Sequence, residues 1–296
     1  MKVIVDNKIP FIKEAIGKIA DEVIYVPGKD FAPALVKDAD ALIIRTRTQC
    51  NRELLQGSRV QFIATATIGF DHIDTEYCHE AGITWTNAPG CNSASVAQYL
   101  QSTLLLINLL KGKNLSEMTI GIVGVGNVGI KVAKVARELG MRVLLNDLPR
   151  EEKEGSTNFC SLQFLAEECD VITFHVPLYK EGKYKTFHLA DEAFFRSLKR
   201  SPIIINTSRG ELVDSKALVA ALESGSIAGA GLDTIDGEPV KSDNPLLQTS
   251  EEAGRKLLFS CHIGGITRAS FSRGYAMILE AIEKVSHGEI PDNIVG

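Results

Sequence analysis

Short runs of β-branched and other apolar residues alternate with amphipathic stretches along most of this 296-residue chain. Such alternation predicts parallel strands joined by helical crossovers, because two successive strands can run parallel only if a crossover separates them. The polar segment Lys111-Gly-Lys-Asn114 divides the alternation into two series. The chain is also longer than one hydrophobic core usually supports. We therefore predict an α/β fold with two parallel-sheet domains, Rossmann-like or flavodoxin-like.

The two series also predict where the domains begin and end. The expected strands of the first series are residues 3–5, 23–26, 41–44, 62–64 and 83–85, and those of the second are 119–123, 142–145, 171–174, 203–206, 229–232 and 256–260. Residues 92–110 and 269–287 have a helical pattern, and we expect the last helix to pack back on the first domain. This predicts a discontinuous substrate-binding domain, 1–92 with 267–296, and a dinucleotide-binding domain, 93–266, with the active site in the cleft between them.

Composition and charge narrow the class of partner. The formal net charge of -5 gives no broad positive field, so we expect neither nucleic acid nor a membrane surface as a partner but a small molecule. The N-terminus lacks a basic stretch followed by an apolar core, which predicts a cytoplasmic location. The six cysteines form no C-x-x-C pair, so we predict reduced thiols and no metal site.

The segment Gly124-Val-Gly-Asn-Val-Gly129 follows an apolar run and opens a helical pattern. In that context, G-x-G-x-x-G is the fingerprint of a dinucleotide-binding turn. Gly124 permits the tight turn, Gly126 lets the backbone approach a pyrophosphate, and Gly129 lets helix and strand pack closely. The N–H groups of Asn127 and Val128, at the helix N-terminus, are then expected to face the phosphates.

Asp147 ends the next apolar run, eighteen residues past Gly129 (147 − 129). A carboxylate at this place can accept hydrogen bonds from the adenosine ribose and repels a 2′-phosphate, which favours NAD over NADP. Arg150 lies close enough to soften the preference, and FAD stays formally open. The structural alternative is that the glycines merely relax a turn and that Asp147 caps a helix.

Three ionisable residues follow later strands: Arg209 in Asn206-Thr-Ser-Arg-Gly210, Glu238 in Asp236-Gly-Glu-Pro239, and His262 in Cys261-His-Ile-Gly-Gly265. Removing a hydride from a carbinol carbon requires a base for the hydroxyl proton, and an acid substrate requires a cation. Imidazole titrates near neutrality, a carboxylate can orient it, and the planar fork of a guanidinium suits a substrate carboxylate. Each residue also has a structural reading, as a buried histidine, an ion pair or a loop carboxylate.

With these motifs the chain resembles the D-isomer-specific 2-hydroxyacid dehydrogenases over nearly its whole length. The resemblance implies that Arg209, Glu238 and His262 are catalytic and that NAD is the cofactor. It is strongest to members acting on 4-phospho-D-erythronate, through residues 65–72, 88–92, 121–129 and 185–191. It therefore implies oxidation of that small phosphorylated 2-hydroxy acid to 2-oxo-3-hydroxy-4-phosphobutanoate in pyridoxine biosynthesis.

Further site residues are implied by the same resemblance. The cofactor contacts it adds are Asp147, Thr207, Ser208, Arg209, Asp233 and Gly265, with Asp233 holding the nicotinamide carboxamide. Substrate contacts are Thr46, Thr67 and the residue after the Gly-rich turn, which is Ile266 here where these relatives have a tyrosine. Arg45 and Arg47 flank Thr46 and offer cations for a phosphate, against the alternative of ordinary solvated strand-end residues.

Other functions stay open at this point. Phosphoglycerate, glycerate or another D-2-hydroxy acid is an alternative substrate, because Arg45-Thr-Arg-Thr48 also resembles the corresponding segment of phosphoglycerate dehydrogenases. An alternative of another class is an NAD(H)-sensing transcriptional corepressor, since a fold does not dictate a function. The resemblance also implies a homodimer, for which the helix at residues 92–110 is a candidate interface.

Overall fold

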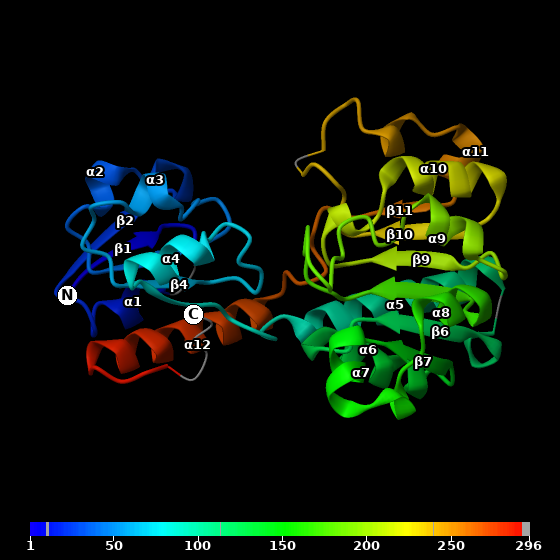
Figure 1. Cartoon of the computed structure of the whole chain (residues 1–296), viewed down its shortest axis with the longest axis horizontal. Helices are drawn as coiled ribbons and strands as arrows, with labels where there is room; N and C mark the ends of the chain where they lie inside the picture. Colours follow the sequence, from blue (N-terminus) through cyan, green and yellow to red (C-terminus); the bar gives the residue numbers. More distant parts are fainter. Residues whose placement is uncertain (10–11, 113, 239, 292–296) are drawn as a thin grey trace. The chain divides into compact units, whose positions relative to one another are not determined.

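The computed structural model describes residues 1–9, 12–112, 114–238 and 240–291. The chain forms two compact units, which we call the smaller unit (Met1–Asn92 with Thr267–Gly296) and the larger unit (Ser93–Ile266). Each contains a parallel sheet with helices on both faces (Figure 1). The predicted α/β fold with two parallel-sheet domains is thereby confirmed.

The sheet of the smaller unit has the order β2-β1-β3-β4-β5. Its strands are β1 (Lys2–Asp6), β2 (Glu22–Val26), β3 (Ala41–Ile44), β4 (Phe62–Thr65) and β5 (Thr84–Thr86). The side chains of neighbouring residues in a strand lie on opposite faces of the sheet. In β1, Ile4 packs in one apolar cluster, and Val3 and Val5 pack in another. Because both faces are covered, the strands read as continuous apolar runs.

Different helices cover the two faces of this sheet. One face carries α2 (Pro33–Val36), α3 (Arg52–Leu55) and α4 (Thr75–Ala81), and the other carries α1 (Ile12–Ile16) and the C-terminal α12 (Arg268–Ser286). The helix α12 begins at a capping box, in which the Thr267 hydroxyl accepts from Ser270 N and the Ser270 hydroxyl accepts from Thr267 N. Tyr275 and Ile278 of α12 are buried against the sheet, so this unit combines the two ends of the chain.

The sheet of the larger unit has the order β11-β10-β9-β8-β6-β7. Its strands are β6 (Thr119–Val123), β7 (Arg142–Asn146), β8 (Val171–Phe174), β9 (Ile203–Asn206), β10 (Gly229–Leu232) and β11 (Leu257–Phe259). The order reverses between β6 and β8, and in open parallel sheets ligands bind beyond the carboxyl ends of the strands at such a reversal. At the edge strand β7, Cys160 N donates to Leu145 O at 2.7 Å.

The helices of this unit also divide between the faces. One face carries α5 (Ser93–Lys111) and α6 (Asn127–Glu138), and the other carries α8 (Leu162–Glu168), α9 (Glu192–Ser197) and α10 (Ser215–Ser224). The short α7 (Leu148–Glu154) follows β7, and α11 (Glu251–Gly254) precedes β11. The long helices α5 and α12 fall within one or two residues of their predicted bounds.

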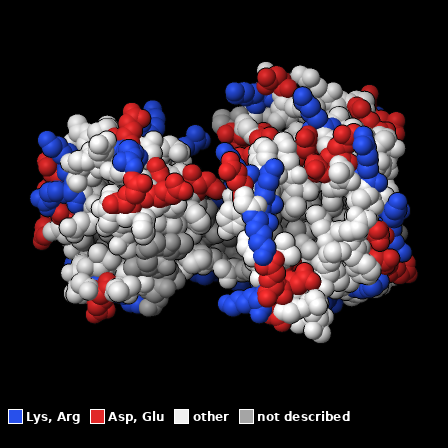
Figure 2. All heavy atoms as spheres, in the orientation of Figure 1, with Lys and Arg blue, Asp and Glu red and all other residues white. Residues whose placement is uncertain are grey.

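Acidic and basic side chains are intermixed over the larger unit on the face drawn in Figure 2. No helix among the described residues is both long and apolar enough to cross a membrane. All six cysteines are free thiols, and burial raises the pKa of Cys78 to about 11 and that of Cys169 to about 12.

Candidate active site

The glycine-rich turn joins β6 to α6 in the larger unit, and each of its three glycines meets a different environment. Gly124 has a φ of 90°, and a Cβ built there would lie 2.5 Å from His175 O. A Cβ on Gly129 would lie 2.0 Å from Gly124 O, so the helix and the turn are in direct contact. A Cβ on Gly126 would meet nothing within 4 Å. The fold itself therefore requires glycine at 124 and 129, whereas Gly126 faces open space.

This open side of the turn fits an anionic ligand. Gly126 is the N-cap of α6 and supplies no side-chain hydrogen bond to the first turn of the helix. The helix begins at Asn127, which is exposed, and Val128, which is half-buried. An N-terminus without a side-chain cap and with a bare Cα beside it is the arrangement in which a dinucleotide pyrophosphate binds.

Asp147 lies at the carboxyl end of β7, where its carboxylate has two contacts with the protein. Oδ1 accepts from Arg150 N at 3.1 Å and so caps α7, while Oδ2 accepts from Val125 N at 2.8 Å. The helix-cap alternative is thus present in the structure, and the second bond ties Asp147 to the glycine turn. Arg150 donates to Val125 O at 2.6 Å and pairs with Glu154 at 2.7 Å, so its guanidinium is held by these partners.

Thr207 and Ser208 follow β9 and anchor that loop against the end of β8. The Ser208 hydroxyl donates to Phe174 O at 2.8 Å, and Thr207 Oγ1 lies 3.3 Å from His175 Nδ1. Burial lowers the pKa of His175 to about 3, so this imidazole is neutral at physiological pH. A neutral, half-buried histidine hydrogen-bonded to two threonines, Thr173 and Thr207, supports the loop and cannot act as a proton carrier near neutrality.

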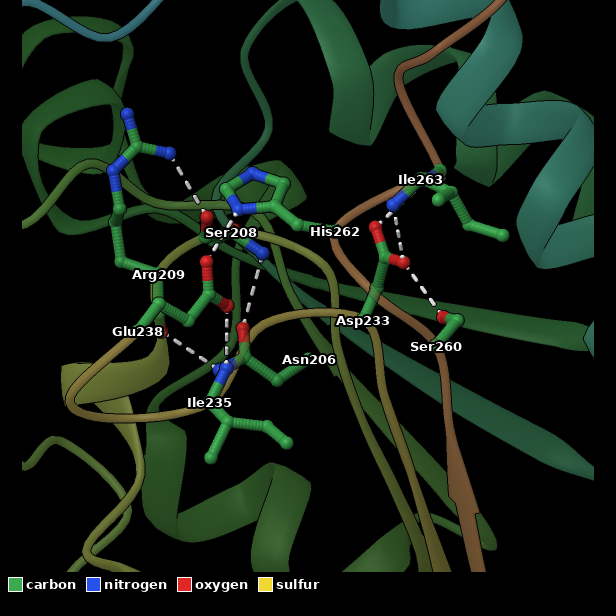
Figure 3. Close-up of polar contacts among 10 residues, drawn as sticks. Asn206, Ser208, Arg209, Asp233, Ile235, Glu238, Ser260, His262 and Ile263 are labelled. Atoms are coloured by element: carbon green, nitrogen blue, oxygen red, sulfur yellow. Dashed lines mark hydrogen bonds and ion pairs between the residues drawn. The ribbon is translucent and has the colours of Figure 1, made fainter. Parts of the chain in front are cut away.

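The three predicted catalytic residues gather at the carboxyl ends of β9, β10 and β11. His262 Nδ1 lies 2.8 Å from Glu238 Oε2, and the other carboxylate oxygen, Oε1, accepts from Ile235 N at 2.9 Å. Arg209 donates to Ser208 O at 2.9 Å. Figure 3 shows its guanidinium on the same side as the His262 ring, above the Glu238 carboxylate.

The charge state of Glu238 follows from these neighbours. Burial raises its pKa, but the hydrogen bonds from His262 and from Ile235 N, together with the charges of His262 and Arg209, hold the pKa below its ordinary value. Glu238 is therefore a carboxylate that orients the imidazole. Because Nδ1 of His262 faces Glu238, Nε2 is the ring nitrogen that does not contact this carboxylate, and the His262 side chain is 47% exposed.

A close approach of two loops brings Arg209 and Glu238 together. A Cβ on Gly210 would lie 2.0 Å from the carbonyl carbon of Ile235 and 2.2 Å from Asp236 N. The residue after Arg209 is thus packed directly on the backbone that leads to Glu238, which requires glycine there. Asn206 Nδ2 donates to Arg209 O at 2.7 Å and fixes the same turn.

Asp233 lies at the end of β10 and holds the loop that carries His262. Its main-chain oxygen accepts from His262 N at 2.8 Å, Oδ1 from Ile263 N at 2.8 Å, and Oδ2 from Gly264 N at 2.7 Å. His262 itself has a φ of 56°, in the left-handed region that a residue with a side chain rarely adopts. The sequence assigned Asp233 to the cofactor and missed this role, because three successive backbone donors leave no signal in a sequence.

The predicted substrate residues are spread more loosely. Arg45 Nη1 lies 3.4 Å from Lys8 O in the smaller unit, and Thr46 and Arg47 are exposed. Thr67 Oγ1 lies 2.7 Å from Thr65 Oγ1 and donates to Gly69 O at 2.9 Å. In the larger unit, Gly265 is half-buried and Ile266 is 54% exposed.

The geometry described above belongs to a known class of enzyme. The model of the D-isomer specific 2-hydroxyacid dehydrogenase, NAD binding domain, matches residues 97–264, which lie within the larger unit and make up more than half of the chain. The chain belongs to the D-isomer specific 2-hydroxyacid dehydrogenase family and is an NAD-dependent oxidoreductase.

Particular relatives narrow the comparison. The chain is 64% identical over 282 residues to the erythronate-4-phosphate dehydrogenase of Bacteroides fragilis (strain YCH46). The matched region covers 95% of this chain and 79% of the relative. The chain is 62% identical over 287 residues to the protein of that name from Bacteroides thetaiotaomicron, covering 97% and 80% respectively. Among solved structures, D-lactate dehydrogenase from Aquifex aeolicus, complexed with NAD and lactic acid, superposes with a TM-score of 0.83 at 27% identity, over 99% of each chain.

Proposed function

We propose that this protein oxidises C2 of 4-phospho-D-erythronate to give 2-oxo-3-hydroxy-4-phosphobutanoate, a step of pyridoxine biosynthesis, with NAD as the oxidant. One arrangement supports the proposal. His262 Nδ1 lies 2.8 Å from Glu238 Oε2, and the guanidinium of Arg209 lies on the same side of the Glu238 carboxylate as the His262 ring (Figure 3). The substrate itself is proposed from the names of the relatives at 62% and 64% identity.

In the proposed reaction, His262 Nε2 removes the proton of the C2 hydroxyl. Glu238 stabilises the imidazolium that forms and fixes the orientation of the ring. Arg209 binds the substrate carboxylate and the oxygen at C2, because a planar guanidinium offers two parallel donors. NAD, when bound, accepts the hydride that leaves C2. The proton therefore goes to His262 and the electron pair leaves with the hydride.

The remaining roles divide between the two units. In the larger unit, we assign the cofactor to the glycine turn with Asn127 and Val128, to Asp147, and to the later loops that contain Thr207, Ser208, Arg209, Asp233 and Gly265. We assign the smaller unit to substrate binding, with Arg45 and Arg47 as cations for the phosphate and Thr46 and Thr67 as polar contacts. Ile266 would add an apolar contact, because it has no hydroxyl to donate.

A substrate panel tests this function. NADH fluorescence is followed with NAD and, separately, 4-phospho-D-erythronate, 3-phosphoglycerate and glycerate. We expect the highest kcat/KM with 4-phospho-D-erythronate, whose phosphate and chain length both match the proposal. A higher value with 3-phosphoglycerate or glycerate would replace the proposed substrate. Tight NADH binding without turnover of any acid would favour the corepressor alternative and contradict an enzymatic role.

We also propose that the protein works as a homodimer through α5. Leu105, Leu106 and Leu109 of α5 are 45%, 38% and 78% exposed, and Ile130 of α6, the helix packed against α5, is 52% exposed. Several large apolar side chains on one helix pair are typical of an interface. Light scattering should give the mass of two chains, and Leu109→Glu should shift it toward one; a monomeric wild type would contradict the proposal.

We place the enzyme in the cytoplasm, where free thiols persist.

A further inference from the structure

A chain of hydroxyl groups leads from α5 to the loop that carries His262. Tyr99 of α5 has its phenolic oxygen 2.7 Å from Ser260 Oγ, and Ser260 Oγ lies 2.6 Å from Asp233 Oδ1. Asp233 is 2% exposed, and its carboxylate accepts from the backbone N–H groups of Ile263 and Gly264. Figure 3 shows Ser260 and Ile263 meeting this carboxylate on the side away from Glu238.

The direction of the hydrogen bonds in this chain is determined by donor count. A serine hydroxyl has one proton, and an ionised carboxylate can only accept, so the Ser260 proton points at Asp233. The bond between Tyr99 and Ser260 must then use the phenolic proton of Tyr99. Burial is the main reason that the pKa of Tyr99 is raised, so the phenol keeps this proton at physiological pH. The order is therefore Tyr99 to Ser260 to Asp233.

The loop is packed closely at Gly264, where a side chain would meet the Asp233 carboxylate. A Cβ on Gly264 would lie 2.8 Å from Asp233 Oδ2 and 3.4 Å from Cγ of Tyr99. The loop thus passes between the Asp233 carboxylate and the Tyr99 ring. Before Gly264 in the same loop, His262 adopts its left-handed φ of 56°, a conformation that costs free energy and persists only where its surroundings enforce it.

We propose that Ser260 and Tyr99 are positioning residues for His262: through Asp233 they hold the left-handed backbone that directs the imidazole to Glu238. The Ser260 hydroxyl donates to Asp233 Oδ1 and so keeps this oxygen aligned with Ile263 N. Neither hydroxyl touches the reacting atoms. The role of His262 as the base rests on the proposed function, whereas the positioning of the loop does not.

The test compares Ser260→Ala, Ser260→Thr and Tyr99→Phe with the wild-type protein. Ser260→Ala removes the donor to Asp233, Ser260→Thr restores a hydroxyl, and Tyr99→Phe keeps the ring against Gly264. Because catalysis is sensitive to misplacement of about 1 Å, we expect Ser260→Ala to lower kcat with 4-phospho-D-erythronate about tenfold or more, with KM changed less. Ser260→Thr should recover most of the rate, and Tyr99→Phe should have the smaller loss.

A second readout does not need turnover. Amide hydrogen exchange followed by NMR should show faster exchange at Ile263 and Gly264 in Ser260→Ala and near-wild-type exchange in Ser260→Thr. The control is Ser197→Ala in α9, which also removes one part-buried hydroxyl, bonded to Phe194 O at 2.7 Å. Unchanged exchange at Ile263 and Gly264 in Ser260→Ala would overturn the proposal even in an active enzyme. If exchange at Ile263 and Gly264 is faster in Ser260→Ala but the wild-type protein turns over no acid, the proposed function is contradicted. The positioning role of Ser260 is then still supported.

Discussion

The carboxylates assigned to chemistry in the larger unit are held by several hydrogen bonds, whereas the two arginines assigned to phosphate recognition in the smaller unit are held far less. Glu238 and Asp233 each accept hydrogen bonds through both carboxylate oxygens. In the smaller unit, Arg45 has a long bond of 3.4 Å and Arg47 is exposed. Catalytic groups that are already in place need no reorganisation during the reaction, whereas a cation that binds substrate can become ordered when its ligand binds. If the proposed roles hold, the difference predicts a preorganised catalytic group and phosphate-binding cations that become ordered when substrate binds.

His262→Ala tests the proposed chemistry of the larger unit most directly. We expect kcat to fall about a thousandfold, in the range that general acid–base catalysis contributes. NADH affinity, measured by fluorescence titration, should stay within about twofold, because the histidine serves proton transfer rather than the cofactor. A retained kcat would show that the base lies elsewhere. The contact with Glu238 would then be structural.

Glu238→Gln should lower kcat about a hundredfold, because an amide cannot stabilise the imidazolium. The pKa of Glu238 is lowered from its ordinary 4.5, so the stabilising contact is present at neutral pH and is lost as pH falls through the lowered pKa. The difference in free energy of unfolding between wild type and Glu238→Gln, from urea denaturation, should therefore shrink below pH 4.5. Glu223→Gln, at an exposed site on α10, is the control. A difference that does not depend on pH would contradict the ionised pair.

Arg45→Ala sharpens the comparison from the smaller unit. We expect KM for 4-phospho-D-erythronate to rise about tenfold or more, since a charge-assisted bond to phosphate is worth about 1.5–3 kcal/mol. The kcat/KM for glycerate, which has no phosphate, should change little. Lys37→Ala removes another exposed cation of the same unit and should leave both values unchanged. An equal loss with the two substrates would mean that Arg45 does not recognise phosphate.

Gly126→Ala tests the cofactor turn without disturbing the protein. Its Cβ would meet nothing within 4 Å, so the Tm should be unchanged, while NADH affinity should fall about tenfold if the pyrophosphate lies against this Cα. Gly129→Ala is the contrasting variant, because its Cβ would lie 2.0 Å from Gly124 O and should lower the Tm. Unchanged NADH affinity in Gly126→Ala would place the cofactor elsewhere.

The smallest effect is expected for Asp147→Asn. The amide oxygen can still cap α7, but the amide nitrogen cannot accept from Val125 N, so the Tm should fall slightly. The negative charge that repels a 2′-phosphate is also lost. The ratio of NAD to NADP affinity should fall several-fold, by an amount of about 1 kcal/mol or less. Fluorescence titration with both reduced cofactors measures it. A constant ratio would show that another residue reads the ribose.

Both sheets and the grouping of the three proposed catalytic residues were predictable from the sequence because their signals are local. Buried strands give apolar runs, and Arg209, Glu238 and His262 each follow such a run, so the carboxyl edge of a parallel sheet brings them together. The contact of Tyr99 with Ser260 joins residues 161 positions apart through ordinary hydroxyls, which no pattern marks. Asp233 shows the same limit: its position was predicted, but its anchoring of the His262 backbone depends on a left-handed turn.

The interleaved construction of the smaller unit has a consequence for synthesis on the ribosome. Val3, Val5 and Phe62 are fully or almost fully buried in a cluster that includes Tyr275 and Ile278 of α12. Nascent chains emerge from the N-terminus, so α1 but not α12 can cover this sheet face until α12 has been translated, whereas all of Ser93–Ile266 has been synthesised by then. We therefore expect the larger unit to fold first, and the first strands to be the last to gain a complete core. A chaperone that binds exposed apolar strands would have its longest opportunity at β1.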